Sequence, residues 1–418
     1  MRIICLIFLC ALSVASVSFA GQLTRLYAFT GGADGKYPYG PLLLDSAGNL
    51  YGVTLEGGIG YGTVFRLSPP LEEGAPWTET VLHTFAGGPS DGASPGGNLI
   101  LDFAGNLYGV AGAGGLTTCL GGSSSGCGVA FRISPSLEYT ILYEFGRVPL
   151  DGWDPQGQIA MDTSGAIYGA TTFGGLSTYS SGTVFKLTPP TVPGGTWTES
   201  VLHVFGTGTD GFEPFGGVTF NADGSLFGTT LFGGTFGRGT VFELSPPPQS
   251  GGVWAASVLH DFSPLAGGFG PVSGVTFDSS GNFYGSTAES TGPRADGTVF
   301  RLNPPSQTGG PWGGSTLFEF GGQDGSYPNR STPALDASGN LWITTASGGT
   351  YDAGTLVELA PPASSGQSWV QKLVYSFSNS WNGGAPAYGV TIGPDGTLYG
   401  TTAGGGDNSS GIVYQYKP

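Results

Sequence analysis

Short runs of hydrophobic residues alternating with polar residues fill most of the chain, and turn-forming residues separate them. β-Branched and aromatic residues dominate the runs, as in residues 226–230 (LFGTT) and 240–244 (TVFEL). Such alternation is typical of strands, and the Gly, Asn, Asp and Pro clusters between the runs favour tight turns. No stretch shows the longer period of an amphipathic helix. The pattern therefore predicts an all-β protein.

One block of this pattern recurs along the whole chain. Its seven copies, several of which read Gly-Thr-Val-Phe, begin at Gly62, Gly128, Gly182, Gly239, Gly297, Gly354 and Gly411. Successive copies start 66, 54, 57, 58, 57 and 57 residues apart. Residues 233–241 (GGTFGRGTV) look like a phosphate-binding loop, but they contain no lysine and no helical pattern follows them. The recurrence of one block along the chain instead indicates a repeat architecture.

Each repeat unit predicts four strands. Residues 217–220, 226–230 and 239–246 illustrate the first three, and residues 197–205 of the preceding unit illustrate the fourth. Four short strands in each of seven units predict a seven-bladed β-propeller of four-stranded antiparallel blades. We expect a single domain over residues 21–418.

The two ends of the chain predict how the ring closes. Residues 22–29 (QLTRLYAF) match the fourth strand of the other units, whereas the last unit, residues 388–418, contains only the first three strands. The N-terminal strand is therefore expected to complete the last blade, which removes both free sheet edges.

Residues 1–20 predict a secretory signal peptide. Arg2 is followed by an apolar run and by small residues up to Ala20, and the run is short for a membrane span. We find no later membrane-spanning pattern and no anchor pattern at the C-terminus. The sequence predicts a secreted or periplasmic protein, with cell-surface association left open. In such a compartment Cys119 and Cys127 are expected to form a local disulfide.

Composition and charge narrow the partners. The 79 glycines and 30 prolines would by themselves indicate disorder, but here they separate strand-like runs. The formal net charge is −16, which argues against nucleic acid and anionic membranes as partners.

The repeated motifs resemble a known family. The recurring DxxGNLYGxT, GTVFxLxPP and VLHxF segments are similar to the "GloVer" repeat of exported bacterial choice-of-anchor repeat proteins. The resemblance covers residues 21–418. It implies an exported or cell-surface propeller and no established activity.

Two residue types that often mark active sites follow the repeat. His83, His203 and His260 share one repeat position, where other units have Tyr or Phe. We therefore interpret it as a packing position, which leaves no histidine for catalysis or metal binding. Five tryptophans also share one position, which favours packing between blades: Trp77, Trp197, Trp254, Trp312 and Trp369.

The loops that enter each first strand are the best candidates for a binding surface. Six of them begin with an acidic or amide residue followed by Gly: Asp34, Asp91, Asp151, Asp210, Asp324 and Asn382. Aromatic residues lie close by in the sequence: Tyr37, Tyr39, Trp153, Phe212, Phe215, Tyr327 and Trp381. In a propeller these loops share one face around the channel. They fit either ordinary Asp-Gly turns or a ring of acceptors and aromatic rings for a glycan, a peptide or a cation. On the opposite face, Asp45, Asp102, Asp162, Asp278 and Asp336 are expected to hydrogen-bond their own turns.

One irregular loop offers the residues of an enzyme. In the fifth unit, residues 288–296 replace the usual Gly-Gly loop and bring Glu289, Arg294 and Asp296 to the channel face. The two carboxylates could perform acid–base chemistry, although a salt bridge with Arg294 is the simpler interpretation.

These observations favour a monomeric, non-enzymatic binding module for carbohydrate or protein, without cofactor or metal. The alternatives are a polysaccharide-active lyase or glycoside hydrolase and a structural adhesion or surface-layer protein.

Overall fold

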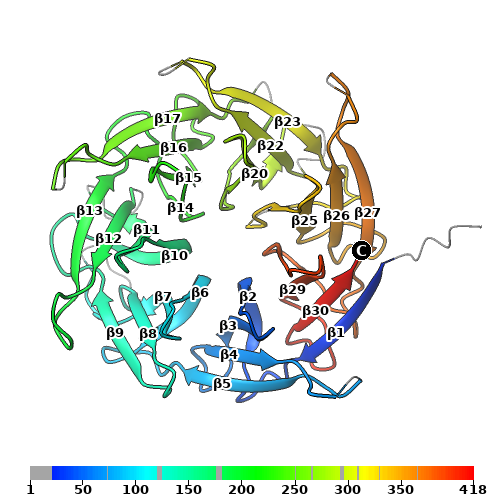
Figure 1. Ribbon diagram of the computed structural model, residues 1–418, viewed down its shortest axis with the longest axis horizontal. Helices are drawn as coiled ribbons and strands as arrows, with labels where there is room; N and C mark the ends of the chain where they lie inside the picture. The colour runs from blue at the N-terminus through cyan, green and yellow to red at the C-terminus, as the bar shows by residue number, and fades with distance from the viewer. Residues whose placement is uncertain are drawn as a thin grey trace, which may run out of the picture.

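The computed structural model describes residues 21–418 apart from residues 73, 120–124, 176–180, 250, 265–266, 292–295, 308–309, 329 and 365. The predicted signal peptide and Arg294 lie outside the described residues. Seven four-stranded antiparallel sheets surround a central axis (Figure 1), as the repeat predicted. The described residues contain strands and turns and no helix that could span a membrane.

The first strand of each blade lies nearest the axis and the fourth lies at the periphery (Figure 1). Blade 1 contains β2 (Lys36–Leu44), β3 (Leu50–Glu56), β4 (Thr63–Ser68) and β5 (Thr78–Thr84). Blade 2 contains β6 (Gly92–Leu101), β7 (Leu107–Gly114), β8 (Val129–Ile133) and β9 (Tyr139–Glu144). Blade 3 contains β10 (Gly152–Met161), β11 (Ile167–Gly174), β12 (Thr183–Thr188) and β13 (Thr198–Val204). The fourth and fifth contain β14 (Val218–Phe220), β15 (Leu226–Thr230), β16 (Thr240–Ser245) and β17 (Ala255–Asp261), then β19 (Thr276–Phe277), β20 (Phe283–Thr287), β22 (Thr298–Asn303) and β23 (Gly313–Glu319). The sixth contains β24 (Ala334–Leu335), β25 (Leu341–Thr345), β26 (Thr355–Ala360) and β27 (Val370–Ser376). Two short strands, β18 (Gly268–Phe269) and β21 (Glu289–Ser290), form a separate pair beside blade 5.

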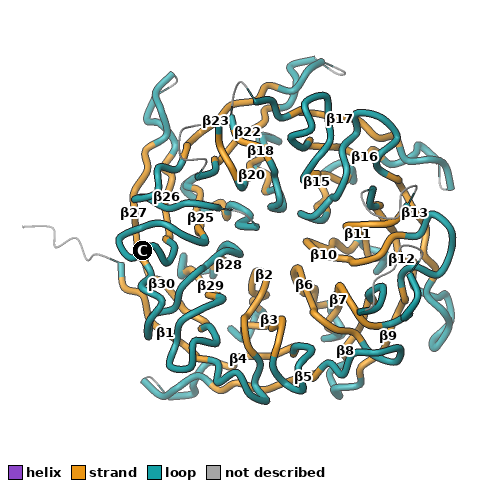
Figure 2. Tube along the Cα trace, turned by 180° about the vertical axis from the view of Figure 1, so that it is seen from behind, coloured by secondary structure: helices purple, strands orange, loops and turns teal. Residues whose placement is uncertain are grey.

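The seventh blade joins the two ends of the chain. It contains β28 (Val390–Ile392), β29 (Leu398–Thr402) and β30 (Ile412–Lys417), and its outer strand is β1 (Gln22–Ala28). Gln22 pairs with Lys417 and Ala28 with Ile412 in the antiparallel ladder, and the ribbon and tube views both show β1 beside β30 (Figures 1 and 2). The predicted closure is confirmed.

Six of the seven blades are packed around a cross-strand pair of a glycine and a large aromatic residue. Gly52 lies opposite Phe65, and a Cβ at Gly52 would lie 2.6 Å from the phenyl ring. In blade 6 the glycine and the aromatic residue are both replaced, by Ile343 and Val357, which lie opposite each other. The glycine of the LYG motif therefore makes room for the ring of the Gly-Thr-Val-Phe motif.

Neighbouring blades meet through a proline and a glycine. The glycine that opens each Gly-Thr-Val-Phe block has a positive φ, +95° at Gly239, and lies against the proline of the next blade's entering loop. A Cβ at Gly239 would approach Pro271 Cδ to 2.7 Å. The residue before each of these prolines also has a positive φ, and its N–H donates across the junction, as Tyr37 does to the carbonyl of Ser410. These contacts hold the channel-face loops in place.

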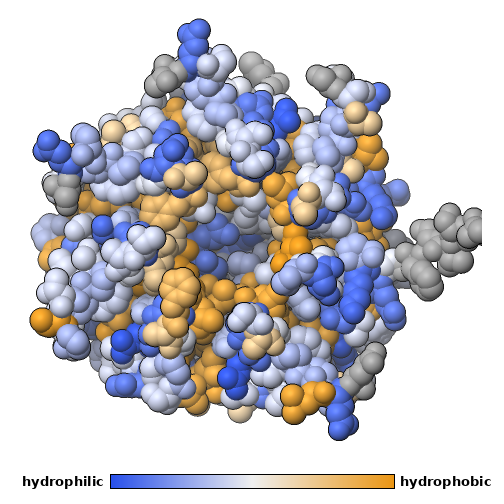
Figure 3. Space-filling view, viewed as in Figure 1, coloured by the Kyte–Doolittle hydropathy of each residue, from blue (hydrophilic) through white to orange (hydrophobic). Residues whose placement is uncertain are grey.

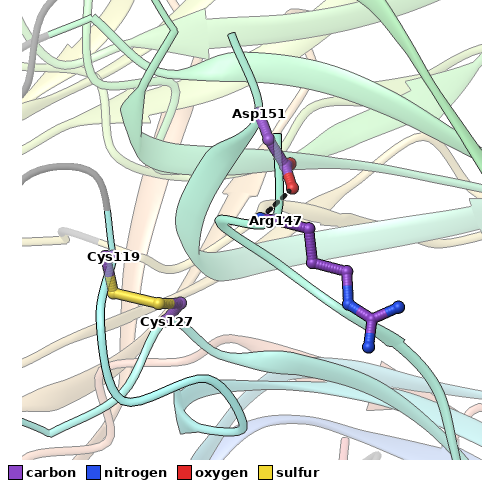
Figure 4. The surroundings of a disulfide bond; sticks show 4 residues. All are labelled: Cys119, Cys127, Arg147 and Asp151. Carbon is purple, nitrogen blue, oxygen red and sulfur yellow. Dashed lines mark hydrogen bonds between the residues drawn. A yellow bond between two sulfur atoms is a disulfide. The ribbon is translucent and has the colours of Figure 1, made fainter. Parts of the chain in front are cut away.

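Other predicted structural features are confirmed. Trp254 packs against Tyr168 of the preceding blade with ring centres 6.1 Å apart, and the other four repeated tryptophans make equivalent contacts. Asp45 Oδ1 accepts the N–H groups of Ala47 and Asn49, and the four equivalent aspartates do the same in their turns. Cys119 and Cys127 form the predicted disulfide (Figure 4).

Candidate functional site

A small cavity lies at the centre of the ring, and all seven blades contribute to its wall. One lining residue from each blade, in order, is Tyr39, Gly97, Gln158, Phe215, Val272, Arg330 and Tyr388. The cavity volume is 40 Å³. The space-filling view shows the face hollowed at its centre, with hydrophobic and hydrophilic surface both bordering the hollow (Figure 3).

Arg330 is the charged residue in this wall. Its guanidinium lies 4.3 Å from the ring centre of Phe215 and 5.1 Å from that of Tyr39. Burial lowers the pKa of Arg330, and its interaction with Tyr388 opposes this effect. Arg330 forms no ion pair with a carboxylate among the described residues. The aromatic faces of Phe215 and Tyr39 and the interaction with Tyr388 therefore stabilise this cation.

The sequence contains a signal for Arg330 that motif analysis missed. From Pro328 to Leu335 the sixth unit has one residue more than the other units have, for example from Pro214 to Phe220. Arg330 has a φ of 63°, as expected for a residue inserted into a tight loop. Arg330 is the second residue after the shared proline, where five other blades have glycine or serine and blade 7 has Tyr388.

A polar chain extends from the cavity to the loop of blade 3. Tyr39 packs against Tyr388 with ring centres 4.4 Å apart, and its hydroxyl donates to Gln156 Oε1 at 3.2 Å. Gln156 Nε2 donates to Asp154 Oδ1 at 2.9 Å. Burial raises the pKa of Asp154 to about 6, and the hydrogen bond from Gln156 limits the rise. Sequence analysis did not select Asp154 or Gln156, because neither follows a repeated motif.

The predicted ring of Asp and Asn side chains points into the blade junctions. Tyr27 donates its hydroxyl to Asp34 at 3.0 Å, and Tyr143 does the same to Asp151 at 3.0 Å. Figure 4 shows Asp151 accepting the N–H of Arg147. Three other members form hydrogen bonds with the residue at the same position of the outer strand: Asp91 with His83, Asp210 with His203 and Asn382 with Tyr375. Asp324 instead accepts the N–H of Gly321 in its own loop. Among the described residues no hydrogen bond joins two members of this set.

These hydrogen bonds explain the histidine position. The rings of His83 and Tyr139 stack 3.9 Å apart, which confirms the predicted packing, and His83 Nε2 also lies 3.1 Å from Asp91 Oδ1. Burial raises the pKa of Asp91, but the hydrogen bonds from His83 and from backbone N–H groups outweigh it and give a net lowering. In the fifth unit the acidic residue is missing, and burial lowers the pKa of His260. Histidine and tyrosine are thus interchangeable here because both bond the acidic residue of the loop.

The predicted aromatic residues divide into three groups. Tyr39 and Phe215 line the central cavity. Trp153, Phe212 and Tyr37 are half-buried, and Trp153 and Phe212 pack on Phe173 and Phe232 of the neighbouring loops, at 4.6 and 5.6 Å. Tyr327 and Trp381 are 42% and 57% exposed, so they remain available to a ligand.

The fifth-unit loop places its two carboxylates in different surroundings. Glu289 is exposed on β21, opposite Phe269, whereas Asp296 is buried and its carbonyl accepts the N–H of Tyr327. Among the described residues, no group of three or more His, Cys, Asp and Glu side chains is arranged to hold a metal ion.

Comparison with known proteins places this chain among repeat proteins. The model of the Gloeobacter/Verrucomicrobia repeat matches residues 116–334, which is more than half of the 418 residues. The chain belongs to the Gloeobacter/Verrucomicrobia repeat family. The match spans blades 3 to 5 and parts of their neighbours, so the sequence resemblance and the family model describe the same repeat.

Other comparisons add little about this family member. A search of curated proteins finds no match to the chain. An X-ray structure of a protein provisionally described as a gluconolactonase matches with a TM-score of 0.38 and 14% identity, covering 69% of this chain and 80% of that chain. A likeness at this level gives no information about activity.

Proposed function

We propose that this protein is an exported, non-enzymatic binding module that holds a carbohydrate or protein ligand on its channel-face loops. Export is supported by the signal-like residues 1–20 and by the disulfide, since disulfides persist in oxidising compartments. The observation that supports binding most directly is the exposure of Tyr327 and Trp381 in the entering loops of adjacent blades. Amphipathic aromatic rings on rigid loops are typical of recognition surfaces.

The loops are rigid enough to present a preorganised surface. Each entering loop is tied to the preceding blade by a proline–glycine contact and a cross-junction hydrogen bond. A ligand would then bind without ordering these loops, which lowers the entropic cost of association.

Glycan arrays and pull-down from culture medium test the proposal, with the intact protein compared with Trp381→Ala and Tyr327→Ala. We expect each variant to weaken binding by about tenfold, the loss of roughly one well-placed aromatic contact. Phe103→Ala is the matched control, because Phe103 is an exposed aromatic residue in the β6–β7 turn. Ligand binding that is equal in all four proteins would exclude this face as the binding surface.

A polysaccharide-active enzyme is the second candidate, supported by Asp154. A carboxyl group with a pKa near 6 is suited to general acid–base catalysis near neutral pH. Activity on polysaccharides that is lost in Asp154→Asn, or in Glu289→Ala and Asp296→Ala, would favour this function over simple binding.

A further inference from the structure

We infer that the central cavity is an anion site in which Arg330 binds one carboxylate group that projects from the ligand. This inference rests on the proposed binding function, because it identifies the chemical group by which a ligand on the channel face would be recognised. It assigns Arg330 as the binding residue and Tyr388, Thr332 and Gln158 as its polar surroundings.

The first argument is the charge of Arg330. Arg330 is half-buried, and withdrawing a charge from water without a partner of opposite charge is costly. Arg330 is stacked between Phe215 and Tyr39, and no described carboxylate forms an ion pair with it. Aromatic faces offset part of the lost hydration, but they leave the N–H donors of the fork without an anionic acceptor.

The second argument is the size of the cavity. A volume of 40 Å³ holds about three water molecules, given roughly 10–15 Å³ for each. A single carboxylate group fits in this space. The planar fork of an arginine suits such a group, because it can donate two parallel hydrogen bonds to the two oxygens.

The third argument is the contrast between the cavity and the rest of the molecule. The chain carries a net charge of −16, so its surface repels polyanions at long range. A cation at the centre of an acidic protein therefore favours a ligand with one acidic group on a largely neutral body. Acidic glycans and peptide C-termini share this chemistry.

The hydrogen bonds around the cavity keep its shape. Gln158 Nε2 donates to Thr332 Oγ1 at 3.3 Å, which joins blades 3 and 6 across the axis. The Tyr39 hydroxyl is already committed to Gln156. These bonds fix the aromatic and amide walls, so Arg330 is the group that remains to bind a ligand.

The inference is tested by adding sodium acetate and, separately, acetamide to the intact protein at pH 7 and low salt. Acetamide has the shape of acetate without its charge. The Nε–H signal of Arg330, assigned from its loss in Arg330→Gln, reports contact by NMR, and calorimetry reports affinity. We expect acetate to shift this signal saturably and to bind at least about tenfold more tightly than acetamide.

Variants separate a binding role from a structural one. Arg330→Gln should abolish acetate binding, and Arg330→Lys should retain it with weaker affinity because the charge remains. Arg238→Gln is the matched control, since Arg238 also stacks on a phenylalanine ring, 4.2 Å from Phe269, but does not line the cavity. If Arg330→Gln does not fold, the comparison of acetate with acetamide on the intact protein decides the matter.

The inference is overturned if acetate and acetamide give the same response, if acetate gives no saturable response, or if a folded Arg330→Gln binds acetate as the intact protein does. Each of these results would mean that Arg330 only fills the channel. Failure of the proposed function is a different result: no glycan or protein is captured, although acetate still binds at Arg330. Conversely, capture that depends on Trp381 and not on Arg330 would support the proposed function alone.

Discussion

Pro38 of the first blade lies against Gly411 of the last, and a Cβ at Gly411 would approach Pro38 Cδ to 2.5 Å. The same contact occurs at every other junction, between Gly62 and Pro95, Gly128 and Pro155, Gly182 and Pro214, Gly239 and Pro271, Gly297 and Pro328, and Gly354 and Pro386. The contact between Pro38 and Gly411 differs from the others in joining the two ends of the chain. The glycine of the repeated motif is thus a requirement of blade packing.

Gly411→Ala should destabilise the protein through this contact. Gly411 has a φ of +92°, so alanine there would have both an unfavourable backbone conformation and a clash with Pro38. We expect a loss of about 2–5 kcal/mol in the free energy of unfolding, measured by denaturant titration.

Gly396→Ala provides the control for backbone strain alone. Gly396 has a φ of +82°, and nothing lies within 4 Å of a Cβ built there. Its substitution should cost about 1–2 kcal/mol. Equal losses for the two variants would show that the proline contact contributes nothing to stability.

Removal of residues 22–29 should leave the ring open and largely unfolded. This segment buries Leu23, Leu26 and Phe29, worth about 5 kcal/mol or more together, which is comparable with the whole stability of a typical domain. Circular dichroism and thermal melting measure the effect.

A circular permutant tests whether closure, and not merely the lost residues, is responsible. Gln22 pairs with Lys417, so a short turn can join residue 418 to residue 21 and place the same strand at the C-terminus. We expect this permutant to regain a cooperative thermal transition. A truncated protein that melts like the intact one would contradict the role of β1 in closure.

The sequence was sufficient to predict the ring because each feature of the fold repeats. Blade number, closure by residues 22–29, packing of the repeated tryptophans and the Asp45-type turns all follow from motifs that occur several times. The central cavity could not be predicted in the same way. Arg330 occurs once, and its neighbours Tyr39, Phe215 and Tyr388 meet it only because the ring closes.

The acidic loop residues illustrate a subtler limit. Their Asp-Gly pattern fits a turn and a ligand-binding ring equally well, and only the structure shows Tyr27 and His83 bonding to Asp34 and Asp91. Comparing the two positions across units would not have revealed the pairing, because His260 has no acidic partner and Asp324 occurs together with Phe318.

Phe318→Tyr should stabilise the protein by restoring this pairing in blade 6. Phe318 occupies the position of Tyr143 and Tyr375 but has no hydroxyl, and the Asp324 carboxylate accepts only the N–H of Gly321 among the hydrogen bonds of the described residues. A hydroxyl directed to Asp324 should add about 0.5–1.5 kcal/mol. Denaturant titration measures the gain.

Phe320→Tyr is the matched control for this substitution. Phe320 is 3% exposed, so its new hydroxyl would be buried without a partner and should cost about 1–3 kcal/mol. If both variants lose stability, the hydroxyl of Phe318→Tyr does not reach Asp324.

Stability should fall as the pH rises through the neutral range. Burial, with the nearby charge of Asp151, raises the pKa of Glu199 to about 8, and burial with the charge of Asp34 raises that of Glu79 to about 7. Glu199 Oε1 and Asp151 Oδ1 are both buried without a described hydrogen-bond partner. Between the ordinary pKa of about 4.5 and these values the folded state holds more protons than the unfolded state, so raising the pH in this window favours unfolding.

Glu199→Gln isolates this effect. Because the carboxyl is only partly buried and solvent screens its interaction with Asp151, we expect the variant to gain about 1 kcal/mol over the intact protein at pH 8.5. At pH 5, where Glu199 is protonated in the folded protein, the two proteins should be nearly equal. Glu138→Gln, at an exposed site in the β8–β9 turn, is the matched control for the substitution itself. If the free energy of unfolding of Glu199→Gln differs from that of the intact protein by the same amount from pH 5 to 8.5, Glu199 keeps its ordinary pKa. The junction between blades 2 and 3 would then carry the charges of both Glu199 and Asp151.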